Sequence, residues 1–328
     1  MKSLEIFSGA GGLAKGLKLS GFEHSGLLEW NRDACNTLRT NFPNSNVFEQ
    51  DIRSFSFSQF KGVDLLGGGP PCQPFSLGGK AMGQQDKRDM FPYAIKGIRE
   101  LAPKAFVFEN VKGLLRQSFA SYFNYIILQL TYPKITLFKN EIWFDHLTRL
   151  EKAHTSGQCP DLKYNIVFRL VNAANYGIPQ KRERVIVVGI RSDLDMEWSF
   201  PNETHSSERL LWDKYVTKEY WEKHVIPLAQ REKLNKQLQI KVEKLKRQYG
   251  FFAPEHKPWT TVRDALVGLP VPNSPDNKIP DHIFREGAKP YPGHTGSHID
   301  EPSKTIKAGD HGVPGGENMI RYTNGTVR

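Results

Sequence analysis

Residues 4–12 of the chain read Leu-Glu-Ile-Phe-Ser-Gly-Ala-Gly-Gly, and this stretch predicts the fold. A short apolar run of strand length leads directly into a turn with three glycines, and residues 13–19 then show helical spacing of apolar side chains. A glycine-rich turn between a first strand and a first helix is a common place for nucleotide-like ligands in α/β proteins. The glycines lack the G-x-G-x-x-G spacing, so a dinucleotide is not favoured.

Outward from this stretch, strand-like and helix-like segments alternate. Strands are expected at residues 4–7, 26–29, 47–50, 63–66, 105–108, 164–171 and 184–189, and helices at residues 13–19, 33–42, 93–101 and 112–130. The alternation predicts an α/β domain with a mostly parallel sheet. We expect a catalytic and cofactor-binding domain over residues 1–195, with residues 131–163 as an insertion loop.

The regular alternation of strand-like and helix-like segments stops after about residue 195. We expect a smaller, irregular domain over residues 196–300. Residues 214–248 hold ten lysines and arginines against four glutamates, and one helical face of this segment carries Leu234, Leu238, Val242 and Leu245. We expect the basic residues to contact phosphates. Residues 301–328 are expected to begin a return to the first domain.

Charge and cysteine content indicate which kind of partner and which cellular compartment suit this protein. The 328 residues carry a net charge of +10, which suits a polyanionic partner. Three cysteines are too few for a disulfide framework, which favours a reducing compartment. They are also too few for a zinc site, so we expect no bound metal. No apolar stretch is long enough to cross a bilayer, and no leader pattern is expected at the start.

Cys72 lies in the sequence Gly-Gly-Gly-Pro-Pro-Cys-Gln-Pro-Phe-Ser, residues 67–76. The prolines fix the backbone beside the cysteine, and the glycines let a ligand approach closely. A free cysteine is more often a small buried side chain. This setting instead favours a nucleophile.

Acidic residues follow the second and third expected strands, as Glu29-Trp30 and Asp51-Ile52. A carboxylate about twenty residues after a glycine-rich turn suits a pair of ribose hydroxyls. Trp30 could stack on an adenine, and Asp51 could accept a hydrogen bond from its amino group. Either acid could be an ordinary surface residue, but their shared place at strand ends predicts an adenosine-containing cofactor.

Two further motifs carry charged groups suited to catalysis. Glu109-Asn110-Val111 ends a later strand, where Glu109 could donate a proton or cap the following helix. In Gln180-Lys181-Arg182-Glu183-Arg184, the two arginines project to the same side of an extended segment. Paired guanidinium groups suit a phosphate or a carbonyl oxygen, although a solvated charge run is the alternative.

In order and spacing, these motifs closely resemble those of the C5-cytosine DNA methyltransferase family, over roughly residues 1–190. The resemblance implies a Rossmann-like sheet of the S-adenosylmethionine-dependent methyltransferases, with residues 196–300 as a target-recognition domain. It implies catalytic roles for Cys72, Glu109, Arg182 and Arg184. It implies S-adenosylmethionine contacts from Phe7, Gly9, Ala10, Gly11, Gly12, Leu13, Glu29, Trp30, Asp51, Ile52, Gly69 and Pro71. It implies substrate contacts from Gln73, Ser76, Asn110, Val111 and Gln180.

The implied function is methyl transfer to C5 of a flipped cytosine in a specific double-stranded DNA site, within a bacterial restriction-modification system and in the cytoplasm. The family's C-terminal Gly-Asn-Ala/Ser-Val motif is absent from the sequence. We therefore expect either a truncated chain or a catalytic subunit that needs a second polypeptide. An apolar surface near Leu13 and Leu17 should then be exposed, unless these leucines face the sheet. An inactive DNA-binding form and a tRNA cytosine-5 methyltransferase remain alternatives.

Overall fold

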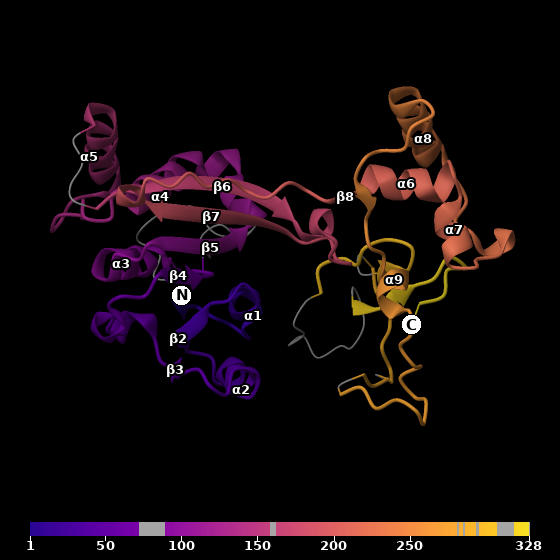
Figure 1. Ribbon diagram of the computed structural model, residues 1–328, viewed down its shortest axis with the longest axis horizontal. Coiled ribbons are helices and arrows are strands. Elements are labelled where there is room, and N and C mark those ends of the chain that lie inside the picture. The colour runs from indigo at the N-terminus through magenta and orange to yellow at the C-terminus, as the bar shows by residue number, and fades with distance from the viewer. Residues whose placement is uncertain are drawn as a thin grey trace. The chain divides into compact units, whose positions relative to one another are not determined.

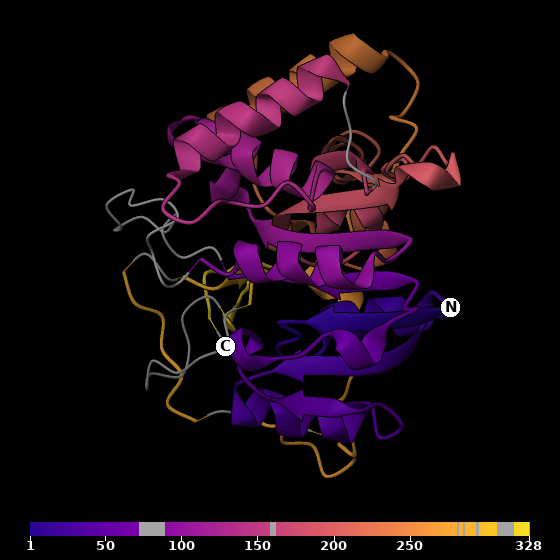
Figure 2. The ribbon, with the colours of Figure 1, turned by 90° about the vertical axis from the view of Figure 1, so that its left-hand side faces the viewer.

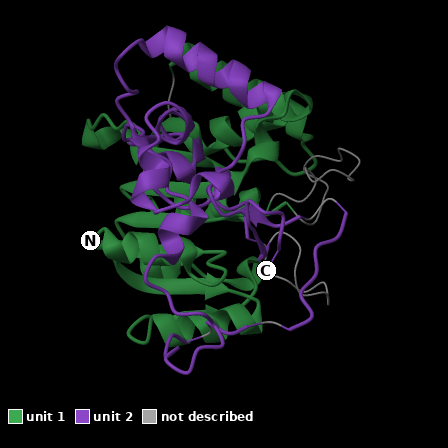
Figure 3. Ribbon diagram, turned by 90° about the vertical axis from the view of Figure 1, so that its right-hand side faces the viewer, with its two compact units in different colours: residues 1–170, 184–200 green, residues 171–183, 201–328 purple. Residues whose placement is uncertain are grey.

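The computed structural model describes residues 1–71, 89–157, 162–280, 282–284, 286–292, 295–306 and 318–327. Cys72, Gln73 and Ser76 lie outside the described residues. The chain forms two compact units, unit 1 with residues 1–170 and 184–200, and unit 2 with residues 171–183 and 201–328 (Figure 3). Unit 2 thus includes residues 171–183, which precede the expected domain boundary.

Unit 1 is built on a seven-stranded sheet with the order β3-β2-β1-β4-β5-β7-β6 (Figure 1). Its strands are β1 (Lys2–Ile6), β2 (Glu23–Glu29), β3 (Val47–Glu49), β4 (Leu65–Gly68), β5 (Ala105–Val111), β6 (Tyr164–Asn172) and β7 (Glu183–Arg191). Strands β1 to β5 are paired in parallel, and β7 runs antiparallel to β5. The expected α/β class with a mostly parallel sheet is confirmed.

Helices cover both faces of this sheet, as the side view in Figure 2 shows. The helices of unit 1 are α1 (Gly12–Leu19), α2 (Arg32–Asn41), α3 (Phe91–Leu101), α4 (Ala120–Thr131) and α5 (Trp143–Ser156). Side chains along β1 point alternately to the two faces of the sheet. On one face, Leu4 and Ile6 join the main core with residues of α3 and α4. On the other face, a smaller cluster joins Ala14 of α1 to Leu27 of β2 and Leu38 of α2.

Short 3-10 turns complete the connections. They are η1 (Ile52–Ser54), η2 (Ser58–Phe60), η5 (Lys112–Leu115), η6 (Gln117–Phe119), η7 (Ala173–Tyr176), η8 (Ser192–Leu194) and η9 (Leu228–Gln230). The continuous helix expected over residues 112–130 is wrong in its first part, because η5 and η6 precede α4.

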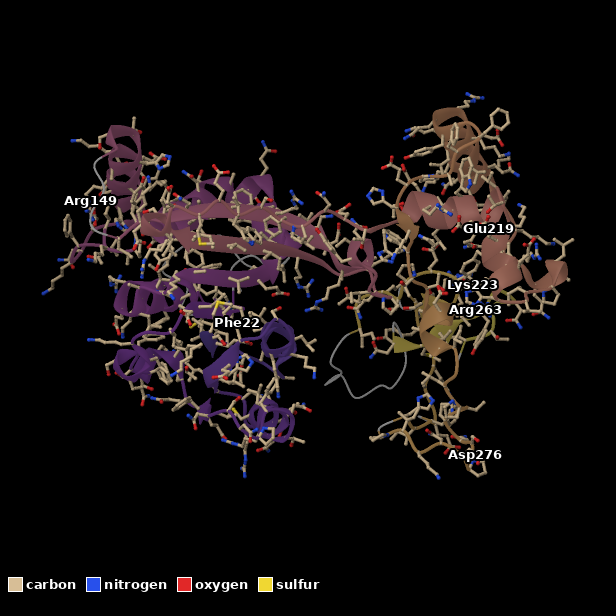
Figure 4. All side chains as sticks on the ribbon, in the orientation of Figure 1. Phe22, Arg149, Glu219, Lys223, Arg263 and Asp276 are labelled. Atoms are coloured by element: carbon tan, nitrogen blue, oxygen red, sulfur yellow. The ribbon has the colours of Figure 1, made fainter. Side chains whose placement is uncertain are left out.

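The segment expected to be an insertion loop, residues 131–163, is not irregular throughout, because it contains the helix α5. The buried His146 imidazole lies 2.8 Å from the Tyr125 hydroxyl and 2.9 Å from the carbonyl oxygen of Ile135. Arg149, labelled in Figure 4, pairs with Glu141 at 2.6 Å. The apolar face of α5 is narrow, so its sequence reads as polar and irregular.

Unit 2 has a separate, smaller core. Its elements are α6 (Ser207–Tyr215), α7 (Glu219–Lys223), α8 (Lys236–Tyr249), α9 (Val262–Leu266), β8 (His205–Ser206), β9 (Lys257–Pro258), β10 (Ser297–His298) and β11 (Ile320–Arg321). Trp221 and Tyr220 of α7 pack with Val242 of α8. Lys223 of α7, labelled in Figure 4, pairs with Asp264 of α9 at 2.6 Å.

Two expectations about individual side chains are corrected. Lys214, in the segment expected to contact phosphates, is fully buried and pairs with Glu232 at 2.6 Å. Leu17 is 8% exposed and, with Leu13, packs over Gly67 of β4, so these leucines face the sheet. Among the helices that the structure describes, none combines the length and apolar character needed to cross a bilayer.

Candidate active site

The turn after β1 has a backbone shape that depends on its glycines. Phe7, Gly9 and Gly11 all have positive φ, at 55°, 52° and 88°. A Cβ on Gly11 would lie 2.7 Å from the Phe42 ring, so no larger residue fits there without displacement. Among the residues that the structure describes, a Cβ on Gly9 or Gly12 would meet no atom within 4 Å. The turn is thus packed against the protein at Gly11 and open at Gly9 and Gly12.

Glu29, at the end of β2, ties this turn to the start of α2. Its Oε2 atom accepts a hydrogen bond from the Gly9 N–H at 2.8 Å, and its Oε1 atom accepts from the Trp30 and Asn31 N–H groups, each at 2.9 Å. A carboxylate oxygen can accept about two hydrogen bonds. Oε2 therefore has capacity for a further donor. The neighbouring Trp30 side chain is 71% exposed.

Asp51, at the end of β3, is paired locally. It caps the turn that begins at the buried Ile52, accepting from the Arg53 N–H at 2.8 Å. Its carboxylate also pairs with the Arg53 guanidinium at 2.5 Å, and this bond holds the pKa of Asp51 below its usual range. The contact of Asp51 with an adenine stays a prediction.

The segment after β4 leads toward Cys72 and is held on both sides. The buried Asn110 donates from Nδ2 to the Pro70 carbonyl oxygen at 3.0 Å, and the Met90 N–H donates to the Pro71 carbonyl at 3.2 Å. A Cβ on Gly69 would lie 3.7 Å from Glu109 Oε2, so this segment passes beside the Glu109 carboxylate. Sequence reasoning missed this positioning role of Asn110.

The neighbouring pair Glu109 and Arg184 joins two motifs that are distant in sequence. Strands β5 and β7 are antiparallel, and Val111 of β5 lies opposite Arg184 of β7. Glu109 lies on β5, two residues before Val111. The Arg184 Nε atom lies 2.7 Å from Glu109 Oε1, with the side chains 22% and 33% exposed. An ion pair of this geometry is a charge-assisted hydrogen bond, and it fixes both side chains at one edge of the sheet.

Gln180 and Arg182 belong to unit 2. Arg182 donates its N–H to Asn172 Oδ1 at 3.2 Å and accepts at its carbonyl from the Ala173 N–H at 3.0 Å. Gln180 forms a parallel bridge with Ser303. The structure therefore groups the first two members of the Gln180-x-Arg182-x-Arg184 motif with unit 2 and Arg184 with unit 1.

One buried acid was missed as well. Glu5 of β1 is 1% exposed, and its Oε2 atom has no hydrogen-bond partner among the described residues. Burial raises the pKa of Glu5 to about 8. The signal was available, because Glu5 sits between two core residues, Leu4 and Ile6, in the first strand.

The candidate site is therefore one edge of the unit 1 sheet. Strands β1, β2, β4 and β5 run in parallel, so the residues after each of them meet at that edge. There the structure places the turn at residues 7–12, Glu29, residues 69–71, and Glu109 with Arg184. Ligands of open α/β sheets bind at the carboxyl ends of the strands.

Comparison with known proteins adds an independent finding. A profile described as C-5 cytosine-specific DNA methylase matches residues 1–132 and 147–308. The type II methyltransferase M.NgoMIV of Neisseria gonorrhoeae is 40% identical over 202 residues, which are 61% of this chain and 55% of that protein. M.AquIA of Picosynechococcus is 32% identical over 283 residues, 84% of this chain and 91% of that protein. M.PspPI of Psychrobacter is 40% identical over 194 residues, 58% of this chain and 40% of that protein. The matches span about half or less of M.NgoMIV and M.PspPI and most of M.AquIA.

Proposed function

The chain belongs to the C-5 cytosine-specific DNA methylase family, and we propose that it transfers a methyl group from S-adenosylmethionine to C5 of a cytosine in double-stranded DNA. We propose further that it serves a restriction-modification system, as the type II methyltransferase names of its relatives suggest. The observation that carries the proposal is the Glu109–Arg184 pair beside the segment that leads to Cys72.

The open turn after β1 fits an adenosine-containing cofactor. Open space at Gly9 and Gly12 would let a ligand approach the backbone, and Glu29 Oε2 can accept from a ribose hydroxyl. The exposed Trp30 ring would stack on the adenine. When bound, S-adenosylmethionine supplies the methyl group.

The protein's own residues would prepare the cytosine. A Cys72 thiolate adds to C6 of the ring, forming an S–C6 bond that makes C5 nucleophilic. Glu109 in its protonated form donates a hydrogen bond to N3 and so favours this addition, while the Arg184 guanidinium donates to the O2 oxygen. After methylation, the C5 proton passes to water and the S–C6 bond breaks, which releases 5-methylcytosine and restores the thiolate.

The cytosine must leave the helix for this chemistry, at a cost of a few kcal/mol. We propose that residues 1–195 carry the chemistry and that residues 196–300 recognise the DNA site, with Arg182 on a phosphate. Gln73, Ser76, Asn110, Val111 and Gln180 remain proposed substrate contacts.

The test is transfer of a labelled methyl group from S-adenosylmethionine to unmethylated double-stranded DNA, with tRNA as the competing substrate. We expect labelled DNA and unlabelled tRNA. Cys72→Ser should abolish transfer because a hydroxyl is a far weaker nucleophile than a thiolate at neutral pH. Cys159→Ser is the matched control and should remain active.

DNA carrying 5-fluorocytosine provides a second readout. The fluorine blocks release of the enzyme, so a covalent adduct should accumulate with the natural chain and with Cys159→Ser. An adduct formed by Cys72→Ser would refute the role of this cysteine. Labelled tRNA with unlabelled DNA would instead establish the RNA methyltransferase alternative.

A further inference from the structure

Residues 299–305 of unit 2 form a clamp on the segment that carries Gln180 and Arg182. The Lys181 N–H donates to the Ser303 carbonyl oxygen at 2.7 Å, and the Ser303 N–H donates to the Pro179 carbonyl at 2.9 Å. The Thr305 hydroxyl donates to the Lys181 carbonyl at 3.0 Å. Both backbone polar groups of Lys181 are therefore bound to this one later segment.

A side-chain ion pair closes the clamp. The Lys181 ammonium lies 2.5 Å from Glu301 Oε2, with the side chains 40% and 31% exposed. The same ammonium lies 5.3 Å from the centre of the Trp259 ring. Trp259 is itself fixed, since its indole N–H donates to Asn175 Oδ1 at 2.9 Å. Lys181 is thus bound from two directions.

Glu301 belongs to a part of unit 2 that is held by several hydrogen bonds. The first N–H groups of α9 bind the backbone around Glu301. The Val262 N–H donates to the Glu301 carbonyl at 2.9 Å, and the Arg263 N–H donates to the Ile299 carbonyl at 2.8 Å. The adjacent Asp300 is completely buried and pairs with the Arg263 guanidinium at 2.6 Å. The Glu301 carboxylate is therefore presented from a fixed backbone.

The clamp determines the direction of the neighbouring side chains. Side chains alternate along an extended segment, so Gln180 and Arg182 project opposite to Lys181. A shift of pairing by one residue would reverse these directions. Fixing Lys181 on Glu301 therefore fixes the face on which Gln180 and Arg182 lie.

We propose that Glu301 is a positioning residue for methyl transfer, acting through Lys181 to orient Gln180 and Arg182 toward the DNA. The inference rests on the proposed function, because it assigns these two side chains to the substrate. It goes beyond that function because Lys181 and Glu301 contact no reacting atom. They would affect the rate of methyl transfer only by positioning other side chains.

Three variants of the full chain test this: Lys181→Met, Glu301→Gln and the double variant. We expect each single variant to lower the single-turnover rate at saturating DNA and cofactor by about tenfold, because misplaced substrate contacts slow the chemical step. The double variant should be no slower than Glu301→Gln alone, since each variant removes the Lys181–Glu301 ion pair and Glu301→Gln also removes the longer contact of Glu301 Oε1 with the Lys214 ammonium, at 4.0 Å. Cofactor affinity and melting temperature should change little, as a partly exposed ion pair contributes little stability.

Glu100→Gln is the matched control. Glu100 pairs with Lys96 along α3 at 3.8 Å, and the two side chains are 40% and 37% exposed. Its loss should leave the rate unchanged. A normal rate in Glu301→Gln, or losses that multiply in the double variant, would overturn the proposal.

Hydrogen exchange of the backbone amides separates this proposal from the proposed function. Glu301→Gln should speed exchange of the Lys181 amide, and Glu100→Gln should not. Unchanged exchange at Lys181 would refute the clamp even in an active enzyme. Faster exchange in a chain without any methyl transfer would show that the clamp exists and that the proposed function has failed.

Discussion

Glu29 accepts backbone hydrogen bonds from both the turn after β1 and the start of α2. Glu29→Gln cannot keep all three bonds, because an amide offers one acceptor oxygen and two donors. We expect S-adenosylmethionine binding to weaken by about 1–3 kcal/mol. Calorimetric titration measures this, with Glu49→Gln as the control, since Glu49 pairs with Arg39 on the surface. Equal affinities in both variants would mean that the cofactor binds elsewhere.

Glu5 predicts a pH dependence of stability. Folding raises the pKa of this carboxyl from 4.5 to about 8, so between these values the folded chain keeps a proton that the unfolded chain has lost. The free energy of unfolding should therefore fall as pH rises, by about 1.4 kcal/mol per pH unit from this group, and level off above the folded pKa.

Glu5→Gln removes this titration, so its stability relative to the natural chain should increase with pH. Urea unfolding at several pH values between about 5 and 9 measures the difference. Parallel pH profiles for the two proteins would show that Glu5 does not titrate in this range.

At this scale, the sequence predicted the positions of charged groups but not their partners. Glu109 and Arg184 were each singled out, yet their pairing depends on the register of β5 and β7. Asn110 was expected to contact substrate, which stays a prediction, but the hydrogen bond from its side chain to the Pro70 carbonyl was not predicted. Such contacts arise from tertiary packing, which the local pattern does not contain.

The helix α8 is the element for which DNA binding can be tested most directly. Lys236 and Lys241 are exposed on it, and Lys233 is exposed just before it. If these residues contact phosphates, each change to glutamine should reduce the slope of log affinity against log salt by about 1. Filter binding or fluorescence anisotropy at several salt concentrations measures the slope.

Lys104→Gln is the control for this series. Lys104 pairs with Asp64 before β5 begins, at the opposite end of the strand from Glu109. Its removal should leave the salt slope unchanged. Slopes that stay constant for all three lysines near α8 would indicate a solvated helix face.

Elements in which apolar side chains recur with a strong period were predicted from the sequence, and elements in which this period is weak were not. The α8 face was predicted in part, with Val242 and Leu245 buried as expected. The helix α5 was missed because His146 fills a core position, and a buried histidine reads as polar in a sequence pattern. The sheet was predicted well because its strands are short apolar runs between glycine-rich or polar turns.

Within the whole molecule, the buried Lys214 is a test of how independently the two units fold. Lys214→Met leaves the Glu232 carboxylate without its cation and with the Tyr215 hydroxyl as its remaining donor, and we expect unit 2 to lose about 3 kcal/mol of stability. Cofactor binding should persist, since the proposed cofactor residues lie in unit 1. Denaturant unfolding and calorimetric titration measure the two effects. Loss of cofactor binding under conditions in which unit 1 remains folded would contradict this expectation.

The sheet order has a consequence for protein synthesis. β7 lies between β5 and β6, although β6 comes earlier in the chain. During translation β6 therefore has no place on the sheet until β7 has been made, and the edge of β5 stays open until then. Arg184 arrives on that late strand, so Glu109 gains its partner among the last events of unit 1 assembly. A nascent chain can thus build its glycine-rich turn well before it completes the charged pair at which the cytosine would bind.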